Sequence, residues 1–536
     1  MKCHLFVLYC LPLFVSAQLK FSHADSLKGQ YGKSREWWDV LHYDIHAKFD
    51  PTAKTVTGKN VITYKVLKTN NEMQLDLMAP MVLDSVVDNS GKRTMRQDGE
   101  AYFIQTVSAP IGSLRSLTVY FHGQPREAKN PPWDGGIIWT KDEKGRPWVS
   151  LACQGMAARV WLPNKDHQQD EPDSATMHFS VPDGMMAVSN GQLKSLSSEN
   201  GYNTFVWKVV NPINNYNIIP YLGNYRMFSD TLLGKKGVLK LEYWVLDYNV
   251  MKARNQFQQA KTMLHFFEEW FGPYPFYEDG YKLVEAPYLG MEHQSGIAYG
   301  NKFSNGYLGR DLSGSGWGLK WDFLIIHESG HEWFGNNITA SDVADNWIHE
   351  SFTTYSENLY TEYLYGKKAG SEYVIGTRKA IRNDKPMIGP YGVNRDGSGD
   401  VYYKGANMLH TLRQMVNNDS LWKELLRSLN KTYWHKTVTS AEIETYVANF
   451  LKLDLSGFFD QYLRSTQLPE LQIRYKKGNL QYRWSNTVKK FHMPVNVFSG
   501  SEQLVLMPTE KWQSIKTTMN NWQLVPDYYV EFKVLN

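Results

Sequence analysis

Residues 327–350 read HESGHEWFGNNITASDVADNWIHE, and this stretch contains the residues that are most informative about the fold and function of the chain. His327 and His331 are four residues apart, so on a helix their side chains leave one face about one turn apart, as two ligands of one metal ion must. Glu328 lies beside them, where its carboxylate can hold a water molecule bound to that metal. Glu350 follows after 18 intervening residues, enough for a turn and a second helix to return a third ligand. Two histidines and one glutamate leave the fourth position of Zn²⁺ open, so the pattern predicts one catalytic zinc ion per chain, as in a metallopeptidase.

The residues around this motif indicate that its helix is buried. The segment Trp321–Ile326, which leads into the motif, is almost entirely apolar, and a helix that is apolar nearly all round belongs in a protein interior. Histidine and glutamate side chains in such a place need polar partners, which a metal ion supplies. Gly330, inside the motif, costs a helix about 1 kcal/mol relative to alanine. We expect close packing against a second helix to offset that cost.

The composition is that of an ordinary globular protein with several domains. The 536 residues are 42% apolar and 21% charged, with no sign of disorder, and the length predicts about two to four domains. The net charge of +4 is small for this size, so no nucleic-acid partner is predicted. Aromatic residues reach 14%, which indicates aromatic-rich β-sheets.

The N-terminus, MKCHLFVLYCLPLFVSAQ, is typical of a secretory signal peptide. We predict that it spans residues 1–17, with cleavage after Ala17, and that the protein is exported to the periplasm or secreted. The apolar run is too short for a membrane anchor. A lipid anchor on Cys10 is disfavoured because the preceding Leu8 and Tyr9 are not small.

The number of cysteines and the hydropathy of the mature chain exclude intramolecular disulfide bonds and membrane-spanning segments. After removal of the signal peptide only Cys153 remains, so no intramolecular disulfide is possible and stability depends on the apolar core. No segment of the mature chain is long and apolar enough to be an integral membrane segment.

The pattern along the chain predicts a multidomain α+β fold. Residues 18–235 contain short alternating runs broken by turns, typical of antiparallel β-structure, at Val40–His46, Val61–Val66, Ser116–Phe121 and Thr204–Val210. Helical spacing dominates residues 236–466, beginning with Ala253–Phe271, which ends at a Gly-Pro pair. Residues 467–536 return to β alternation, at Leu471–Tyr475 and Leu480–Trp484.

The zinc motif with its flanking residues resembles the M1 aminopeptidases, the gluzincin family that includes leukotriene A4 hydrolase. The resemblance rests on Trp333-Phe-Gly-Asn336 after the motif and on Glu350-Ser-Phe-Thr-Thr-Tyr355, and it extends over nearly all of the mature chain. It implies an N-terminal antiparallel β saddle domain, a thermolysin-like mainly α catalytic domain and a small C-terminal β-sandwich-like domain.

Leu289-Gly-Met-Glu-His293 resembles the exopeptidase motif of that family. The resemblance implies that Glu292 binds the free α-amine of the substrate, with Gly290 and Met291 also at the substrate and the backbone donor of Gly290 facing the scissile carbonyl. Leu289 and His293 depart from the family's usual glycine and asparagine, which puts the shape of the pocket in question more than the chemistry.

Two further segments carry implied substrate contacts. Val401-Tyr-Tyr-Lys-Gly-Ala406 resembles the segment with the family's transition-state tyrosine, which selects Tyr402, with Tyr403 as the alternative. Gln154, five residues before Arg159, takes the place of a residue that lines the pocket for the substrate's N-terminus.

These residues together predict a zinc aminopeptidase that acts on peptides with a free N-terminus. Glu328 would accept the proton of the metal-bound water and return it to the leaving amine, and Tyr402 would donate a hydrogen bond to the oxyanion. A thermolysin-like endopeptidase is an alternative, although it has no use for Glu292. A second alternative is an M1-like binding protein that has lost catalysis.

Two acidic residues near the ligands have undecided roles in the sequence. Asp345 is a candidate acceptor for the outer nitrogen of a ligand histidine, because metal-bound imidazoles usually have such a partner. Glu357 lies two helical turns after Glu350 on the same face, where it either supports the site or is solvated.

Overall fold

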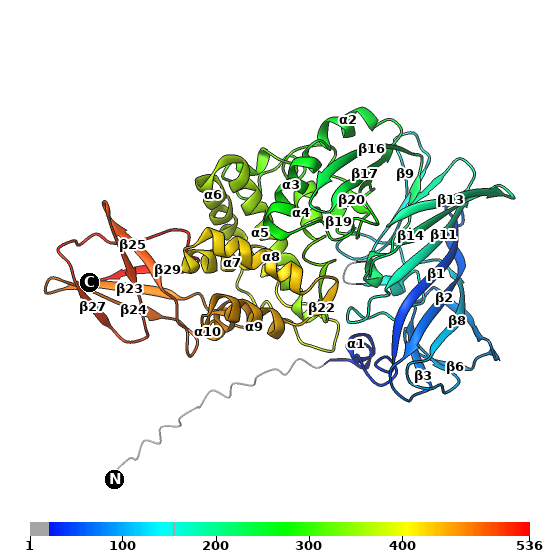
Figure 1. The fold of residues 1–536 in the computed structure, drawn as a ribbon, viewed down its shortest axis with the longest axis horizontal. Helices are drawn as coiled ribbons and strands as arrows, with labels where there is room; N and C mark the ends of the chain where they lie inside the picture. The colour runs from blue at the N-terminus through cyan, green and yellow to red at the C-terminus, as the bar shows by residue number, and fades with distance from the viewer. Residues whose placement is uncertain (1–20, 154–155) are drawn as a thin grey trace, which may run out of the picture.

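The computed structural model describes residues 21–153 and 156–536. The predicted signal peptide, residues 1–17, and Gln154 therefore lie outside the described residues. Figure 1 shows three regions in sequence order: a β-rich N-terminal region, a central helical region and a β-rich C-terminal end. A short helix, α1 (His23–Gly29), lies beside the N-terminal sheets.

The largest sheet has eight strands and confirms the predicted β-structure of the N-terminal region, but it is mixed and not wholly antiparallel, because β1 and β11 pair in parallel. Its central strand β1 places Tyr43, Ile45 and Ala47 in the interior, whereas the alternate residues are partly exposed, as expected for a sheet with one buried face. In spatial order the strands are β13 (Gln192–Glu199), β14 (Tyr202–Val209), β11 (Ser174–Pro182), β1 (Trp38–Asp50), β2 (Thr55–Val66), β8 (Leu114–Gly123), β4 (Val82–Asp88) and β5 (Gly91–Lys92).

Two smaller sheets complete the N-terminal region. The first has four strands, in the order β12 (Met186–Val188), β15 (Tyr221–Gly223), β10 (Pro147–Ala152) and β9 (Gly136–Lys141). The second has three strands, in the order β3 (Glu72–Asp76), β7 (Ala101–Gln105) and β6 (Met95–Asp98).

A five-stranded sheet connects the N-terminal and helical regions. Tyr243 of this sheet packs into the core shared with the helices, whereas its neighbour Trp244 packs into the core of the N-terminal sheets. The sheet is therefore buried on both faces, and its edge strand β19 holds Gly290 and Met291 of the segment that resembles the exopeptidase motif. Its strands, in spatial order, are β16 (Tyr225–Gly234), β17 (Gly237–Leu246), β18 (Tyr281–Glu285), β20 (Ile297–Tyr299) and β19 (Gly290–Met291). The predicted domain boundary at residues 235 and 236 lies in the turn between β16 and β17; it stays a prediction.

Helices dominate the region after this sheet, as predicted. The segment expected to be one helix from Ala253 to Phe271 is instead two helices, with the break at Phe257 and Gln258, and the second ends before Gly272 at a φ of 102°. The helices are α2 (Val250–Gln256), α3 (Gln259–Phe271), α4 (Phe323–Gly330), α5 (Trp347–Tyr365), α6 (Lys367–Thr377), α7 (Tyr403–Val416), α8 (Asp419–Thr432), α9 (Ser440–Leu451) and α10 (Ser456–Leu463). Short 3₁₀ turns lie at Ala158–Val160, Asn215–Asn217, Trp317–Leu319, Val343–Asp345, Arg378–Ala380 and Gly399–Val401, and strands β21 (Ile338–Ala340) and β22 (Lys436–Val438) pair in parallel.

Helices α4 and α5, which carry the zinc motif and Glu350, pack very closely at Gly330. A Cβ atom on Gly330 would lie 2.9 Å from the Ser356 hydroxyl and 3.1 Å from the Thr353 methyl group. The expected close packing at this glycine is therefore confirmed.

The C-terminal end contains two further sheets that share one core. Trp484 from the first sheet and Val497 from the second belong to the same cluster of buried side chains, which extends into the helical region. The first sheet has the order β27 (Gln513–Lys516), β24 (Asn479–Ser485), β23 (Glu470–Lys476) and β29 (Glu531–Leu535); the second has β26 (Glu502–Leu506), β25 (Val495–Ser499) and β28 (Gln523–Leu524).

The architecture confirms the predicted multidomain α+β fold. Within residues 21–153 and 156–536, none of the helices combines the length and the hydrophobicity that a membrane-spanning helix needs. Cys153 is buried and carries a free thiol.

Candidate zinc active site

Helix α4 begins at a polar cap that fixes the position of the zinc motif. The Asp322 carboxylate accepts hydrogen bonds from the backbone N–H groups of Leu324 and Ile325, at 3.1 and 3.4 Å, as an N-cap residue does. The same carboxylate accepts a hydrogen bond from the Tyr299 hydroxyl at 2.7 Å. This anchoring connects the start of α4 to strand β20 of the five-stranded sheet.

The three predicted zinc ligands converge at one buried point. The Nε2 atoms of His327 and His331 lie 3.6 and 3.4 Å from Oε2 of Glu350, and the three potential ligand atoms all lie within 4.8 Å of one another. Two atoms that bind one tetrahedral Zn²⁺ at about 2.1 Å are separated by about 3.4 Å. The residues present therefore fit a zinc ion held by two imidazoles and one carboxylate.

The outer nitrogens of both imidazoles are engaged, which directs Nε2 of each ring toward that point. His327 Nδ1 lies 2.7 Å from Oε1 of Glu357, and His331 Nδ1 lies 3.0 Å from the carbonyl oxygen of Phe334. Such outer contacts fix the ring orientation and the tautomer of a metal-binding histidine. In the neutral tautomer with the proton on Nδ1, each ring presents the unprotonated Nε2 that a metal requires.

The sequence left the acceptor of this outer hydrogen bond undecided, and the structure selects Glu357. The Glu357 carboxylate is buried and also accepts a hydrogen bond from the Tyr373 hydroxyl at 2.6 Å. The interpretation of Asp345 as an acceptor for a ligand histidine is wrong. The Asp345 carboxylate instead accepts hydrogen bonds from Ser440 and, at 2.6 Å, from the Tyr391 hydroxyl.

Glu328 lies beside the ligand set, with its carboxylate against strand β19. A Cβ atom built on Gly290 would lie 3.0 Å from Oε1 of Glu328, so a side chain at position 290 would contact this carboxylate. Burial, opposed by the charges of the two neighbouring histidines, raises the pKa of the Glu328 carboxyl to about 7.

Glu292 brings a second carboxylate into the same group. Potential ligand atoms of Glu292, Glu328 and His331 all lie within 4.8 Å of one another. The Glu292 carboxylate accepts a hydrogen bond from the Tyr216 hydroxyl at 3.2 Å, and burial raises its pKa. Its backbone carbonyl accepts a hydrogen bond from the Asn336 side chain at 2.9 Å. The exopeptidase motif is therefore held from the N-terminal region and from the segment after the zinc motif.

The two departures from the family motif lie in different surroundings. His293 is fully buried, with Nδ1 2.6 Å from the Tyr221 hydroxyl, which itself donates to the Gly296 carbonyl. Its side chain therefore anchors the loop after β19 and does not line the cavity. Leu289 is half-buried and contributes an apolar surface to the cavity beside the zinc ligands.

The two candidate tyrosines both line that cavity. Tyr402 is half-buried just before α7, with its ring centroid 6.0 Å from that of His327. Burial and then the charge of Glu350 raise the pKa of the Tyr402 hydroxyl, whereas burial and the charge of Glu357 raise the pKa of the Tyr403 hydroxyl. Of the two, Tyr402 lies on the side of the ligand Glu350.

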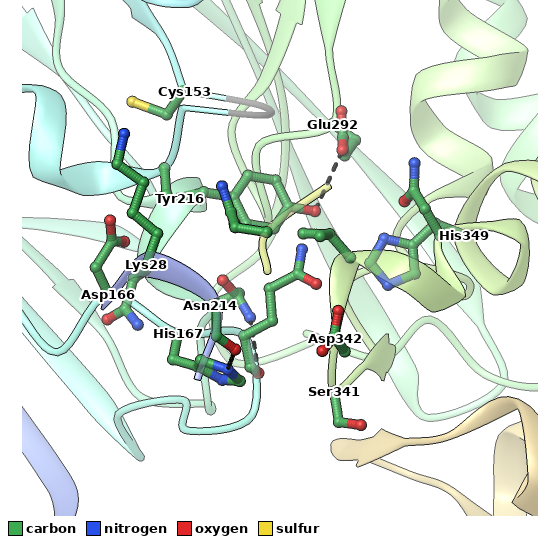
Figure 2. Close-up of a pocket in the computed structure, with 17 residues that line it drawn as sticks. Lys28, Cys153, Asp166, His167, Asn214, Tyr216, Glu292, Ser341, Asp342 and His349 are labelled. Carbon is green, nitrogen blue, oxygen red and sulfur yellow. Dashed lines mark hydrogen bonds between the residues drawn. The ribbon is translucent and has the colours of Figure 1, made fainter. Parts of the chain in front are cut away.

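Glu292 separates two cavities. The catalytic cavity contains the zinc ligands, Glu328, Tyr402 and the apolar side chains near β19. The second cavity, called the amine-side cavity after the predicted role of Glu292, is also lined by Glu292, and Figure 2 shows the Tyr216 hydroxyl directed at Glu292 there. Most of the residues that line it are polar, with Lys28, Asp166 and His167 on one side and Ser341, Asp342 and His349 on the other. Sequence reasoning missed this lining because its residues come from distant segments.

Comparison with family models and curated proteins supports this interpretation. Residues 255–462 match the model described as Peptidase family M1 domain. The chain is 22% identical over 479 residues to leukotriene A-4 hydrolase of Xenopus laevis, covering 82% of this chain and 74% of that protein. It is 25% identical over 475 residues to human aminopeptidase B, covering 80% and 69%. It spans about half the length of endoplasmic reticulum aminopeptidase 1 of Mus musculus, at 22% identity over 471 residues.

Solved structures resemble this fold over most of the chain. A mutant of a two-domain M1 zinc metallopeptidase bound to L-tryptophan superposes with a TM-score of 0.69 at 21% identity, covering 82% of this chain and 96% of that one. A mutant of the M1 zinc metallopeptidase of Deinococcus radiodurans, bound to the substrate Tyr-Ser-Ala, gives the same TM-score and identity, covering 81% and 96%.

Proposed function

Since this chain is a zinc metallopeptidase of family M1, we propose that it is an aminopeptidase, which hydrolyses the first peptide bond of peptides with a free N-terminus. One observation carries the proposal: a buried carboxylate, Glu292, lies in one group with Glu328 and a zinc ligand. An endopeptidase needs no such group at that position.

The charge of Glu292 explains why the first peptide bond would be selected. A buried carboxylate costs free energy unless a cation or hydrogen bonds compensate it. The α-ammonium group of a peptide supplies that cation, whereas an internal residue offers only a neutral amide. With the α-amine at Glu292, the first carbonyl would lie close to the metal ligands.

The remaining residues divide the catalytic work. A bound Zn²⁺ would activate water and polarise the scissile carbonyl. Glu328 accepts the proton of the attacking water and delivers it to the leaving amine. The Tyr402 hydroxyl donates a hydrogen bond to the oxyanion that forms on the carbonyl.

Three further residues complete the proposed substrate site. Gly290 and Met291 form β19, at the edge of the five-stranded sheet, so an extended peptide can lie along this edge. Gln154, by resemblance to the family, would line the pocket for the substrate's N-terminus.

The test is a panel of aminoacyl-coumarin substrates, each assayed with a free amine and with an N-acetyl group. We expect hydrolysis of free-amine substrates only, lost with a zinc chelator and restored by Zn²⁺. Equal hydrolysis of the acetylated series would favour an endopeptidase. No hydrolysis of either series by folded, zinc-loaded protein would favour a binding protein without catalysis.

We also propose that the protein is exported, on the basis of the signal-peptide pattern in residues 1–17. Expression of the full chain in a bacterium tests this proposal. N-terminal sequencing should find Gln18 as the first residue of protein recovered from the periplasm or medium, and an intact Met1 in the cytoplasm alone would contradict it.

A further inference from the structure

The catalytic cavity has an apolar wall, formed by side chains other than the zinc ligands and Glu292. Its members come from three separate segments and include Pro132, Trp133, Leu289, Tyr307, Leu312 and Phe323. None of these side chains has a part in the chemistry described above. Their common property is a hydrophobic surface directed at the space next to the zinc ligands.

The position of Glu292 determines which part of a peptide meets this wall. The α-amine is proposed to bind at Glu292, which lines both cavities, and we assign the first side chain to the amine-side cavity, whose lining includes the polar Asp166, Asn214 and Ser341. The first carbonyl lies at the zinc ligands, and the chain then continues into the catalytic cavity. The second residue of the peptide is therefore the one that reaches the apolar wall.

Trp133 is the unusual member of this wall. It lines the cavity, yet 63% of its surface is exposed, although most large aromatic residues of this protein are buried. Its loop, residues 129–135, belongs to the N-terminal region and approaches the cavity from outside the catalytic region. An exposed indole beside a substrate path offers a large surface that a ligand can cover.

The loop that carries Trp133 is held by its own hydrogen bonds. The Asp134 carboxylate accepts hydrogen bonds from the backbone N–H groups of Lys129 and Asn130, at 2.7 and 2.9 Å. The Trp133 N–H donates to the Asn130 carbonyl at 3.0 Å, and Gly135 closes the turn with a φ of 64°. The backbone that carries Trp133 is therefore held in place before substrate arrives, which lowers the entropic cost of binding.

We propose that Trp133 determines specificity at the second residue of the peptide, by covering a large apolar side chain such as phenylalanine or leucine against the wall that includes Leu289. The inference rests on the proposed aminopeptidase function and names its substrate class: peptides whose second residue is large and apolar. The side chain at this position leaves water when it packs between the indole and the wall.

The test uses the tripeptides Ala-Xaa-Ala, with glycine, alanine, leucine or phenylalanine in the middle, and measures release of the first alanine. For the natural chain, kcat/KM for phenylalanine should exceed that for glycine by about tenfold or more, as for burial of a side chain in an apolar pocket. Trp133→Ala should reduce this ratio to below about threefold and leave the glycine peptide within about twofold. Trp133→Phe should keep most of the preference.

A matched control and a binding measurement separate specificity from a structural effect. Ile111→Ala removes another exposed apolar side chain of the N-terminal region, 65% exposed, and should change no ratio. In the Glu328→Gln background, calorimetry should show about tenfold weaker binding of Ala-Phe-Ala after Trp133→Ala, with Ala-Gly-Ala unchanged.

The outcomes distinguish this inference from the proposed function. Alanine release at similar rates from all four peptides, or an equal loss on all four after Trp133→Ala, would overturn the role of Trp133 and leave the aminopeptidase proposal intact. Alanine release from none of them would overturn the proposed function, and the inference with it.

Discussion

At the scale of single residues, Glu357 has the clearest effect on the metal without contacting it. Its carboxylate holds Nδ1 of His327 at 2.7 Å, so Glu357→Gln should weaken zinc affinity by about 10–100-fold. Competition with a chelating fluorophore measures this directly. Glu362→Gln is the control, because Glu362 lies on the same helix but pairs with Arg413 at 2.7 Å. Equal zinc affinity in the Glu357 variant and the natural chain would show that Glu357 does not support zinc binding.

The two neighbouring tyrosines allow a matched comparison. Tyr402→Phe removes the proposed oxyanion donor and should lower kcat by about 10²–10³-fold, with zinc content unchanged. Tyr403→Phe removes a hydroxyl from the same cavity and should lower kcat by less than about fivefold. If Tyr403→Phe has the larger effect, the two assignments are exchanged.

Glu292 is the residue on which the distinction between exopeptidase and endopeptidase depends. Glu292→Gln removes the charge and keeps the shape, so kcat/KM for free-amine substrates should fall by about 10²-fold or more, with zinc retained. N-acetylated substrates, which the natural chain should not hydrolyse, should remain unhydrolysed by this variant. Unchanged activity on free-amine substrates would exclude Glu292 as the amine partner.

At the scale of helices and strands, the zinc motif shows what local sequence can specify. The spacing of His327 and His331, and the apolar residues before them, predicted a buried helix with two ligands on one face. Helix α4 is buried and contains His327, and His331 is its C-cap residue, with a helical backbone conformation. Glu350 was predicted from the family motif and from its distance along the chain. These features depend on helical periodicity, which a sequence displays directly.

What the sequence could not predict depends on contacts between distant segments. Asp345 and Glu357 are both acidic residues near a ligand, and only the docking of α5 against α4 decides that Glu357 reaches His327. The break between α2 and α3 could not be predicted, because neither Phe257 nor Gln258 is a glycine or proline. The amine-side cavity is formed by residues as far apart in the sequence as Lys28 and His349, and no local sequence pattern predicts that such residues lie close together.

The contact between α4 and α5 is itself testable at Gly330. In an exposed helix Gly330→Ala would stabilise by about 1 kcal/mol, but here the added Cβ lies 2.9 Å from the Ser356 hydroxyl, so the variant should be destabilised by about 1–3 kcal/mol. Chemical denaturation measures the difference. Adding Ser356→Ala removes the nearest atom and should recover part of the loss. A stabilised single variant would contradict the close packing.

At the scale of the whole molecule, the site depends on two cores meeting at one sheet. Side chains of the five-stranded sheet alternate between the core of the N-terminal sheets and the core of the helices, and Glu292 directly follows the edge strand β19 of this sheet. Tyr216 and Trp133 reach the site from the N-terminal region, and the zinc ligands reach it from the helical region. The substrate path therefore lies where these regions join.

From this arrangement we expect a bound zinc ion to stabilise the whole helical region against unfolding, and not only the three ligand side chains. Without Zn²⁺, Glu292, Glu328 and Glu350 lie close together in a buried site, and the metal's positive charge offsets their repulsion. Zinc at about 1,000 times its dissociation constant adds about 4 kcal/mol to the stability of the part that binds it. Calorimetry should show the transition of the helical region at a lower temperature after chelation and restored by Zn²⁺, with the transition of any independently unfolding region unchanged. Glu350→Gln, which loses a ligand, should show a much smaller shift on adding Zn²⁺. An equal shift in this variant would mean that zinc stabilises the protein at some other place.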